Sequence, residues 1–254
     1  MGPDIGPILS EWPFEPGRIS VRIVQTADGE PRIQVRLDLG ILQMHVDGRP
    51  DGQRPDGFES LLEMHTSEID ASREGDVPGE PVESDVRLSP EDCRALREEA
   101  VQYYHRYVAL LVVNDFERVV RDTTRNLRVL DLCRDYGREP SDRAAMEQFR
   151  PYIMIMRSRA LASLLVQLDE PKAAILALDE GLDTLRGFYQ EHGIASGFDE
   201  SAEVQMLRGM REALMPKLPV SQSAELRSRL QKAIEQENYE LAAILRDELR
   251  QAKG

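Results

Sequence analysis

Histidine and cysteine are the side chains that most often hold metals or act as nucleophiles, and this chain has few of them. They are scattered along the sequence at His45, His65, Cys93, His105, Cys133 and His192. The two cysteines form no CxxC pair and occupy apolar helical positions, which predicts reduced thiols packed in a core. His45 and His65 belong to one N-terminal unit, but two histidines without a cysteine or carboxylate pattern do not predict a metal site.

Catalytic sequence motifs are missing as well. The chain contains no GxSxG, HExxH or GxGxxG spacing and no kinase signature. Acidic residues are abundant, but burial and proximity decide which of them could act as an acid–base pair, and the sequence gives neither. We therefore predict a non-enzymatic protein with no cofactor and no metal.

The polar segment most suited to binding is the loop at 47–57, DGRPDGQRPDG. It repeats an RPDG unit, which predicts similar settings for Arg49 and Arg54. Two arginines in a glycine-bearing loop are suited to hold a carboxylate or a phosphate. The alternative is a rigid turn that returns the chain to the next helix, because Asp-Gly pairs after prolines favour tight turns. The spacing does not match GxxxxGK[ST], so no nucleotide site is predicted.

The charge of the chain argues against nucleic acid as a partner. Its 254 residues carry a net charge of −14, without a basic stripe interleaved with aromatic residues. We therefore expect no direct nucleic-acid binding. No apolar run approaches the length of a membrane span, and the N-terminus lacks the positive start of a signal peptide. These features predict a cytoplasmic protein without membrane contact.

Residues 18–46 have the period-two pattern that is typical of antiparallel strands. Apolar and polar side chains alternate on both sides of Asp28-Gly29, a dipeptide that favours a hairpin turn. The apolar phase changes at Gly40, which indicates a bulge or a sharp bend into a third strand. A short helix is expected at Phe58–Met64. We assign residues 1–65 to a small antiparallel β-unit.

The middle of the chain divides into an acidic linker and a helical bundle. Between 66 and 92, nine acidic residues stand against two arginines, a composition typical of a solvated spacer. We assign this linker to 66–88, with an acidic regulatory tether as the alternative. Ser89-Pro90 favours a helix start, and helical spacing continues to 216 with a break at Asn114-Asp115. The sequence thus predicts a bundle over 89–216 and a mainly helical α+β fold.

Part of this bundle resembles a tetratricopeptide repeat. The segment ALASLLVQLDEPKAAILALDEGL, residues 160–182, has small Ala162 and Ala174 and bulky Leu178 where that repeat places them. Residues 103–127 resemble a degenerate copy, with Tyr107 at the small position. The copies lie 55 residues apart rather than about 34. The resemblance implies a tetratricopeptide-like bundle with an insertion at 133–150, and a plain helical bundle is the alternative.

Residues 223–254 follow a second short linker, 217–222, and have the pattern of a helical hairpin. Apolar side chains recur at helical spacing in two stripes, formed by Leu226, Leu230, Ala233 and Ile234 and by Leu241, Ala242, Leu245 and Leu249. Ala242 and Ala243 allow a close approach of the two helices beside Tyr239. Helices this short bury little surface alone, so the remaining apolar stripe needs a partner. That partner is another hairpin of the same kind, the helical bundle of this chain or a different protein.

This hairpin resembles the UVR motif, which is found in the bacterial excision-repair proteins UvrB and UvrC and in regulators of the Clp protease. The residues that match are Leu226, Leu230, Ala233, Ile234, Tyr239, Ala242, Ala243, Leu245, Arg246, Asp247 and Leu249. The resemblance implies a protein-docking module in which Arg246 and Asp247 fix the hairpin by hydrogen bonds. The whole chain is similar to an uncharacterised bacterial family known by this motif alone.

From these features we predict a scaffold or adaptor that docks partners through the hairpin. The partner is expected to be another UVR-containing protein, or a second copy in a homodimer. Residues 223–254 carry six basic and six acidic side chains, so charge does not oppose self-association. The alternatives are an accessory factor of nucleotide excision repair or of Clp-type proteolysis, and a receptor that binds an anion or another ligand through Arg49 and Arg54. The Clp regulators carry zinc-binding cysteine pairs, which this sequence lacks.

Overall fold

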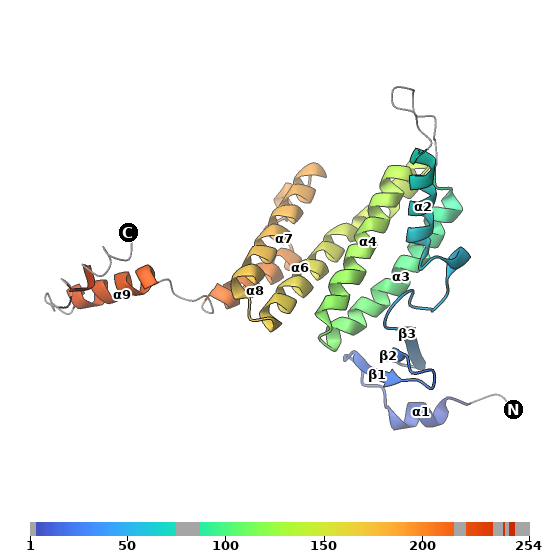
Figure 1. Ribbon diagram of the computed structural model, residues 1–254, viewed down its shortest axis with the longest axis horizontal. Helices are drawn as coiled ribbons and strands as arrows, with labels where there is room; N and C mark the ends of the chain where they lie inside the picture. The colour runs from blue at the N-terminus through green and yellow to red at the C-terminus, as the bar shows by residue number, and fades with distance from the viewer. Residues whose placement is uncertain (1–3, 75–86, 216–221, 236–240, 242–243, 247–254) are drawn as a thin grey trace, which may run out of the picture. The chain divides into compact units, whose positions relative to one another are not determined.

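The protein is mainly helical, with a small antiparallel sheet near the N-terminus (Figure 1). The computed structural model describes residues 4–74, 87–215, 222–235, 241 and 244–246. Contacts divide the chain into two compact units, Met1–Arg211 and Glu212–Gly254. The predicted α+β fold class, dominated by helices, is confirmed.

The N-terminal part is a three-stranded antiparallel sheet preceded by a short helix. Its elements are α1 (Gly6–Glu11), β1 (Ser20–Gln25), β2 (Pro31–Leu37) and β3 (Gly40–His45), with strand order β1-β2-β3. Ile33 in the central strand pairs with Ile23 on one side and Met44 on the other. The strands, the Asp28-Gly29 turn and the antiparallel pairing are as the alternation predicted.

The change of apolar phase at Gly40 comes from a sharp bend and not from a bulge. Leu37 pairs directly with Gly40, so only Asp38 and Leu39 form the turn between β2 and β3. A two-residue turn reverses the chain and shifts the parity of the inward-facing positions. Leu39 continued the apolar alternation of the sequence, but it lies at the tip of the turn and is exposed.

Helix α1 was not predicted, and the segment that follows it contacts polar side chains of the sheet. The Arg22 guanidinium lies 4.2 Å from the centroid of the Trp12 ring, a cation–π contact. Arg36 donates from Nε to the Trp12 carbonyl at 2.6 Å and is buried. The N-terminal segment therefore shields arginines that the alternation placed on a solvated face.

The remaining helices of the first unit form a layer in which α3, α4, α6 and α7 lie side by side (Figure 1). The elements are η1 (Pro55–Gly57), α2 (Leu61–Glu74), α3 (Pro90–Val112), α4 (Phe116–Tyr136), α5 (Pro140–Ala145), η2 (Glu147–Phe149), α6 (Arg150–Gln167), α7 (Pro171–Glu191), η3 (Ala195–Gly197) and α8 (Ala202–Leu214). Among the described helices, none is both long and apolar enough to cross a bilayer.

Local capping explains where helices α3 and α4 begin. Ser89 caps α3 through a capping box with Asp92, and Pro90 occupies the first helical position. Asn114 adopts a φ of 60° between α3 and α4, and Asp115 then caps α4 by accepting from the Arg118 amide. Both predicted helix boundaries are confirmed.

The predicted linker at 66–88 is partly structured. Helix α2 extends through Glu74 instead of ending at Met64, because Ile69 is buried in the core. At the other end, Leu88 is buried and forms a parallel bridge with Gly137. Composition predicted solvation over the whole segment, but two buried apolar side chains anchor its ends. Residues 75–86 lie outside the described part of the chain.

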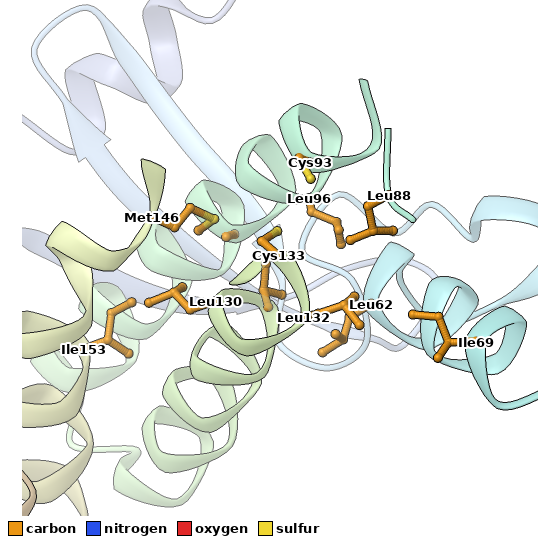
Figure 2. Packing of buried hydrophobic residues seen from close by; sticks show 12 residues of the cluster. Leu62, Ile69, Leu88, Cys93, Leu96, Leu130, Leu132, Cys133, Met146 and Ile153 are labelled. Atoms are coloured by element: carbon orange, nitrogen blue, oxygen red, sulfur yellow. The ribbon is translucent and has the colours of Figure 1, made fainter. Parts of the chain in front are cut away.

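One apolar cluster joins α2, α3, α4 and the start of α6 (Figure 2). Its labelled members are Leu62, Ile69, Leu88, Cys93, Leu96, Leu130, Leu132, Cys133, Met146 and Ile153. Burial raises the pKa of the Cys133 thiol to about 12, so this sulfur stays protonated and unreactive at neutral pH. The prediction that both cysteines are core residues is confirmed.

Helices α6 and α7 form a tight pair at the segment that resembles a tetratricopeptide repeat. Ala162 and Ala174 are fully buried, and a Cβ added to Gly181 would collide with the Ser158 hydroxyl. Small residues thus set a close helix–helix distance. Helix α5 and η2 fall within the predicted insertion at 133–150. The tetratricopeptide resemblance itself stays a prediction.

A buried arginine joins the sheet to the helical layer. Arg106 of α3 donates from Nε and Nη2 to both oxygens of Asp122 on α4, at 2.7 and 2.8 Å. Its Nη1 donates to the carbonyl of His45 at the end of β3, at 3.1 Å, and to that of Gly48 in the following loop, at 2.7 Å. Both charged side chains are fully buried, so each needs the other to offset its lost hydration.

Next to the Arg106–Asp122 pair, three more exposed side chains connect α4 to the loop after β3. They are Asp47, Arg118 and Arg121. Arg118 binds both oxygens of Asp47, at 2.9 and 3.0 Å. Arg121 donates to the Val46 carbonyl at 2.8 Å and also binds Asp47. Hydrogen bonds from Arg118 and Arg121 lower the pKa of the Asp47 carboxyl from its ordinary value to about 2, Arg118 contributing most. The loop after β3 is therefore clamped to α4 by charge-assisted hydrogen bonds.

Removing Arg106 should strongly destabilise the first unit. We expect Arg106→Met to lower the free energy of unfolding by about 3 kcal/mol, since the buried Asp122 carboxylate loses both bonds to Arg106 and keeps only its ion pair with Arg121. Arg106→Met with Asp122→Leu should recover part of the loss. Arg18→Met, which breaks an exposed pair with Glu15, should cost less than about 1 kcal/mol. Urea unfolding measures all three, and equal losses for Arg106→Met and Arg18→Met would contradict this role.

Asp47 should make the free energy of unfolding depend on pH in the acid range. Its pKa is depressed in the folded state, so the stabilisation is present above the unfolded-state pKa near 4 and is lost as the pH falls toward 2. Because the Asp47 side chain is 57% exposed, we expect about 1 kcal/mol or less. Unfolding curves between pH 5 and 2 should be less pH-dependent for Asp47→Asn than for the wild type. Parallel profiles would show that the ion pair contributes nothing.

Candidate functional site

The described residues of the C-terminal segment form a small apolar cluster. Helix α9 (Gln222–Glu235) provides Leu230 and Ala233, and a helical residue of the second arm, Leu245, packs against them. Ala233 and Leu245 are buried, and Leu230 is partly buried. These three contacts hold the arms together, as expected of an amphipathic pair.

A second set of apolar side chains points away from this cluster. Ile234 is 47% exposed, Leu241 37% and Ile244 58%. The sequence pattern placed Ile234 in one stripe with Ala233, but successive helical residues are turned by about 100° and Ile234 faces outward. Three large apolar side chains exposed on one small hairpin are suited to contact another apolar surface.

Of the other predicted docking residues, the structure describes the side chain of Arg246. Arg246 is exposed at the end of the described second arm. The side chain of Leu226 lies outside the described part of the chain, as do Tyr239, Ala242, Ala243, Asp247 and Leu249. Their predicted roles in packing and docking therefore stay predictions.

The two arginines of the RPDG repeat lie in different settings. Arg49 is largely buried, and its Nε lies 3.1 Å from Asp51 and 3.3 Å from Glu99. Arg54 precedes η1 and is exposed. The repeat predicted equivalent positions, but only the first copy meets α3, so tertiary contacts separate the two.

These contacts favour the rigid-turn interpretation of the loop over an anion site. The Arg49 charge is balanced by Asp51 and by the fully buried Glu99, which also binds Arg125. Gly52 adopts a φ of 75° and packs so close to His45 that a Cβ would collide with the imidazole ring. The glycine thus serves a close approach of the loop to β3.

Sequence reasoning missed an aromatic cavity of about 500 Å³ in the first unit. It is lined by Arg97, Ala100, Val101, Tyr104, His105, Tyr107, Asn126, Met146, Phe149, Tyr152 and Ile153. Its walls come from α3, α4, α6 and the segment before α6, so residues about fifty positions apart meet there. The one signal of this cavity in the sequence is the group of tyrosines at 103, 104 and 107 of α3.

Two further features bear on ligand binding, namely metal-ligating side chains and a second hollow. Among the described residues, no three His, Cys, Asp or Glu side chains are placed to hold a metal ion. A hollow of about 470 Å³ beside the joint is lined by Arg106, Arg121, Arg125 and Arg128 together with Glu59, Glu63 and Asp122. Because charges of both signs line it, this hollow has no clear preference for an anion.

Comparison with known proteins identifies one region of the chain. Residues 223–254 match the family model described as the UvrB/uvrC motif, UVR. No curated protein and no solved structure matches the chain. The UVR motif occurs in proteins of DNA repair and proteolysis and generally serves protein–protein interaction. The hairpin that carries exposed Ile234, Leu241 and Ile244 is thus the region that matches a protein-interaction motif.

Proposed function

We propose that this protein is a non-enzymatic adaptor that docks its partner through the outward apolar face of the C-terminal hairpin. We define this face as Ile234, Leu241 and Ile244. The observation that carries the proposal is the exposure of these three side chains on a segment that matches the UVR motif. We assign no catalytic role to any residue of the chain.

The hairpin has two sets of apolar residues, one that packs inside it and one that we assign to docking. Leu230, Ala233 and Leu245 contact one another and hold the arms together. Among the described residues, that cluster does not include the three side chains of the outward apolar face. Burial of their exposed area against a partner therefore adds stabilisation of about 25 cal/mol per Å². Docking therefore does not require the hairpin to unfold.

The partner class follows from the chemistry of the hairpin. A surface with large aliphatic side chains and no net charge over 223–254 fits another apolar helical hairpin. We propose a second UVR hairpin, on another protein or on a second copy of this chain. An accessory role in excision repair or in Clp-type proteolysis is the finer alternative, and the identity of the captured partner distinguishes them.

An anion receptor built on the RPDG loop is the weaker candidate. It requires Arg49 and Arg54 to be available together. Arg49 already contacts Asp51 and Glu99, and only Arg54 is exposed. A ligand would have to displace two carboxylates from Arg49, which costs affinity.

Charges on the outward apolar face should abolish docking without unfolding the hairpin. We expect Ile234→Glu with Ile244→Glu to reduce recovery of a UVR-bearing partner, or of a second copy, at least about tenfold. The measurement is affinity capture with tagged full-length chain from the native cell, quantified by mass spectrometry. Self-association is measured in parallel by analytical ultracentrifugation.

Two comparison variants make this result specific. Leu176→Glu introduces one such negative charge at a 63% exposed apolar position of α7, and this variant should capture the partner normally. Leu230→Asp with Ala243→Asp places charge at the partly buried Leu230 and should also lower the helix content, seen by circular dichroism. If the Ile234→Glu, Ile244→Glu variant keeps the wild-type partners and association state, the hairpin face is not the docking surface.

A further inference from the structure

The aromatic cavity of the first unit has a closed floor and an aromatic rim. Ala100, Tyr107, Asn126, Met146 and Ile153 line it and are buried. The rim residues are exposed, namely Val101, Tyr104, His105, Phe149 and Tyr152. Figure 2 shows Met146 and Ile153 next to Leu130 in the apolar cluster, so the floor rests on the core of the bundle. A volume of about 500 Å³ is in the range of small-molecule sites.

The tyrosines around the cavity form one ring cluster. The centroid of the Tyr104 ring lies 5.5 Å from that of Tyr107, edge to face, and 6.3 Å from that of Tyr152. Burial and the neighbouring Tyr104 phenol raise the pKa of Tyr152. The Tyr152 phenol therefore remains a neutral hydrogen-bond donor at physiological pH.

The Tyr107 phenol is a polar group in the buried part of the cavity lining. The side chain lines the cavity and is only 1% exposed. Burial raises the pKa of this phenol well above its ordinary value, so the hydroxyl stays protonated and can donate a hydrogen bond. A ligand acceptor in the cavity would be able to accept that hydrogen bond.

Arg97 gives the cavity its charge. It is the one charged side chain among the described residues that line it. Its Nη1 lies 3.1 Å from Asp142, outside the cavity lining, and the guanidinium has further N–H donors. A guanidinium binds carboxylates in a planar, two-pronged geometry. An apolar cavity with a single cation at its edge is complementary to a flat apolar anion.

We propose that this cavity binds a small aromatic carboxylate. The ring system packs between Tyr104, Phe149 and Tyr152, and the carboxylate accepts hydrogen bonds from Arg97. A second polar acceptor of the ligand pairs with the Tyr107 hydroxyl. The site lies in the first unit and uses no residue of the C-terminal hairpin, so it stands independently of the docking function.

The test compares two probes that differ in charge alone, 2-naphthoate and its neutral isostere 2-naphthamide. Each is titrated into the ¹⁵N-labelled full-length chain, and Kd is taken from amide chemical shifts. We expect 2-naphthoate to bind with a Kd at or below about 1 mM, and 2-naphthamide to bind at least about fivefold more weakly. The shifted amides should lie around the cavity.

Substitutions test separately the aromatic surface of the site and its charged residue, Arg97. Tyr104→Ala with Tyr152→Ala should weaken 2-naphthoate at least about tenfold, because the stacking surface is lost. Arg97→Gln should remove the preference for the carboxylate, and Arg97→Lys should restore it in part. Phe58→Ala, which removes an aromatic ring outside the cavity, and the Ile234→Glu, Ile244→Glu variant should both bind like the wild type.

Three outcomes would overturn the assignment. They are the absence of binding up to about 10 mM, equal affinity for the two probes, and an unchanged Kd in the Tyr104→Ala, Tyr152→Ala variant. Circular dichroism and the spectrum of the free protein show whether each variant is folded. If the Ile234→Glu, Ile244→Glu variant binds 2-naphthoate normally, the cavity site can be judged independently of the docking proposal.

Discussion

The Arg106 guanidinium is the contact on which the first unit depends. It holds the Asp122 carboxylate of α4 with one side and the carbonyls of His45 and Gly48 with the other. One buried cation thus joins α3, α4 and the end of β3. The loop after β3 is consequently a structural connection, in which Asp47 and Arg49 pair with helical residues while Arg54 stays exposed. Exposed apolar side chains also lie on the C-terminal hairpin, at Ile234, Leu241 and Ile244.

Features set by neighbours in sequence were predictable. The alternation of 18–46 gave three antiparallel strands, since a half-buried strand must turn every second side chain inward. The Ser89 capping box and the left-handed Asn114 before Asp115 are short-range signals, and both mark real helix boundaries. The contact of Leu230 and Ala233 with Leu245 likewise follows from the helical spacing of apolar residues in two stripes.

Features set by residues distant in sequence were not predictable. Arg106 meets Gly48 across 58 positions, and the RPDG repeat gave no sign that Arg49 would be buried while Arg54 stays exposed. The aromatic cavity joins α3 to the start of α6, so no local pattern could reveal it. Periodicity predicts which residues face inward, but it does not predict which residues they contact. It is also imprecise at the edge of a stripe, since Ala233 is buried and the adjacent Ile234 is exposed.

The central claim is that the outward face of the hairpin is where a partner protein binds. Photo-crosslinking tests it most directly, with p-benzoylphenylalanine placed at Ile244 or, for comparison, at Leu176 in the full-length chain inside its native cell. The account predicts a crosslink from position 244 to the helical hairpin of a partner or of a second copy, and none to that partner from position 176. Crosslinks from 176 alone, with none from 244, would contradict it.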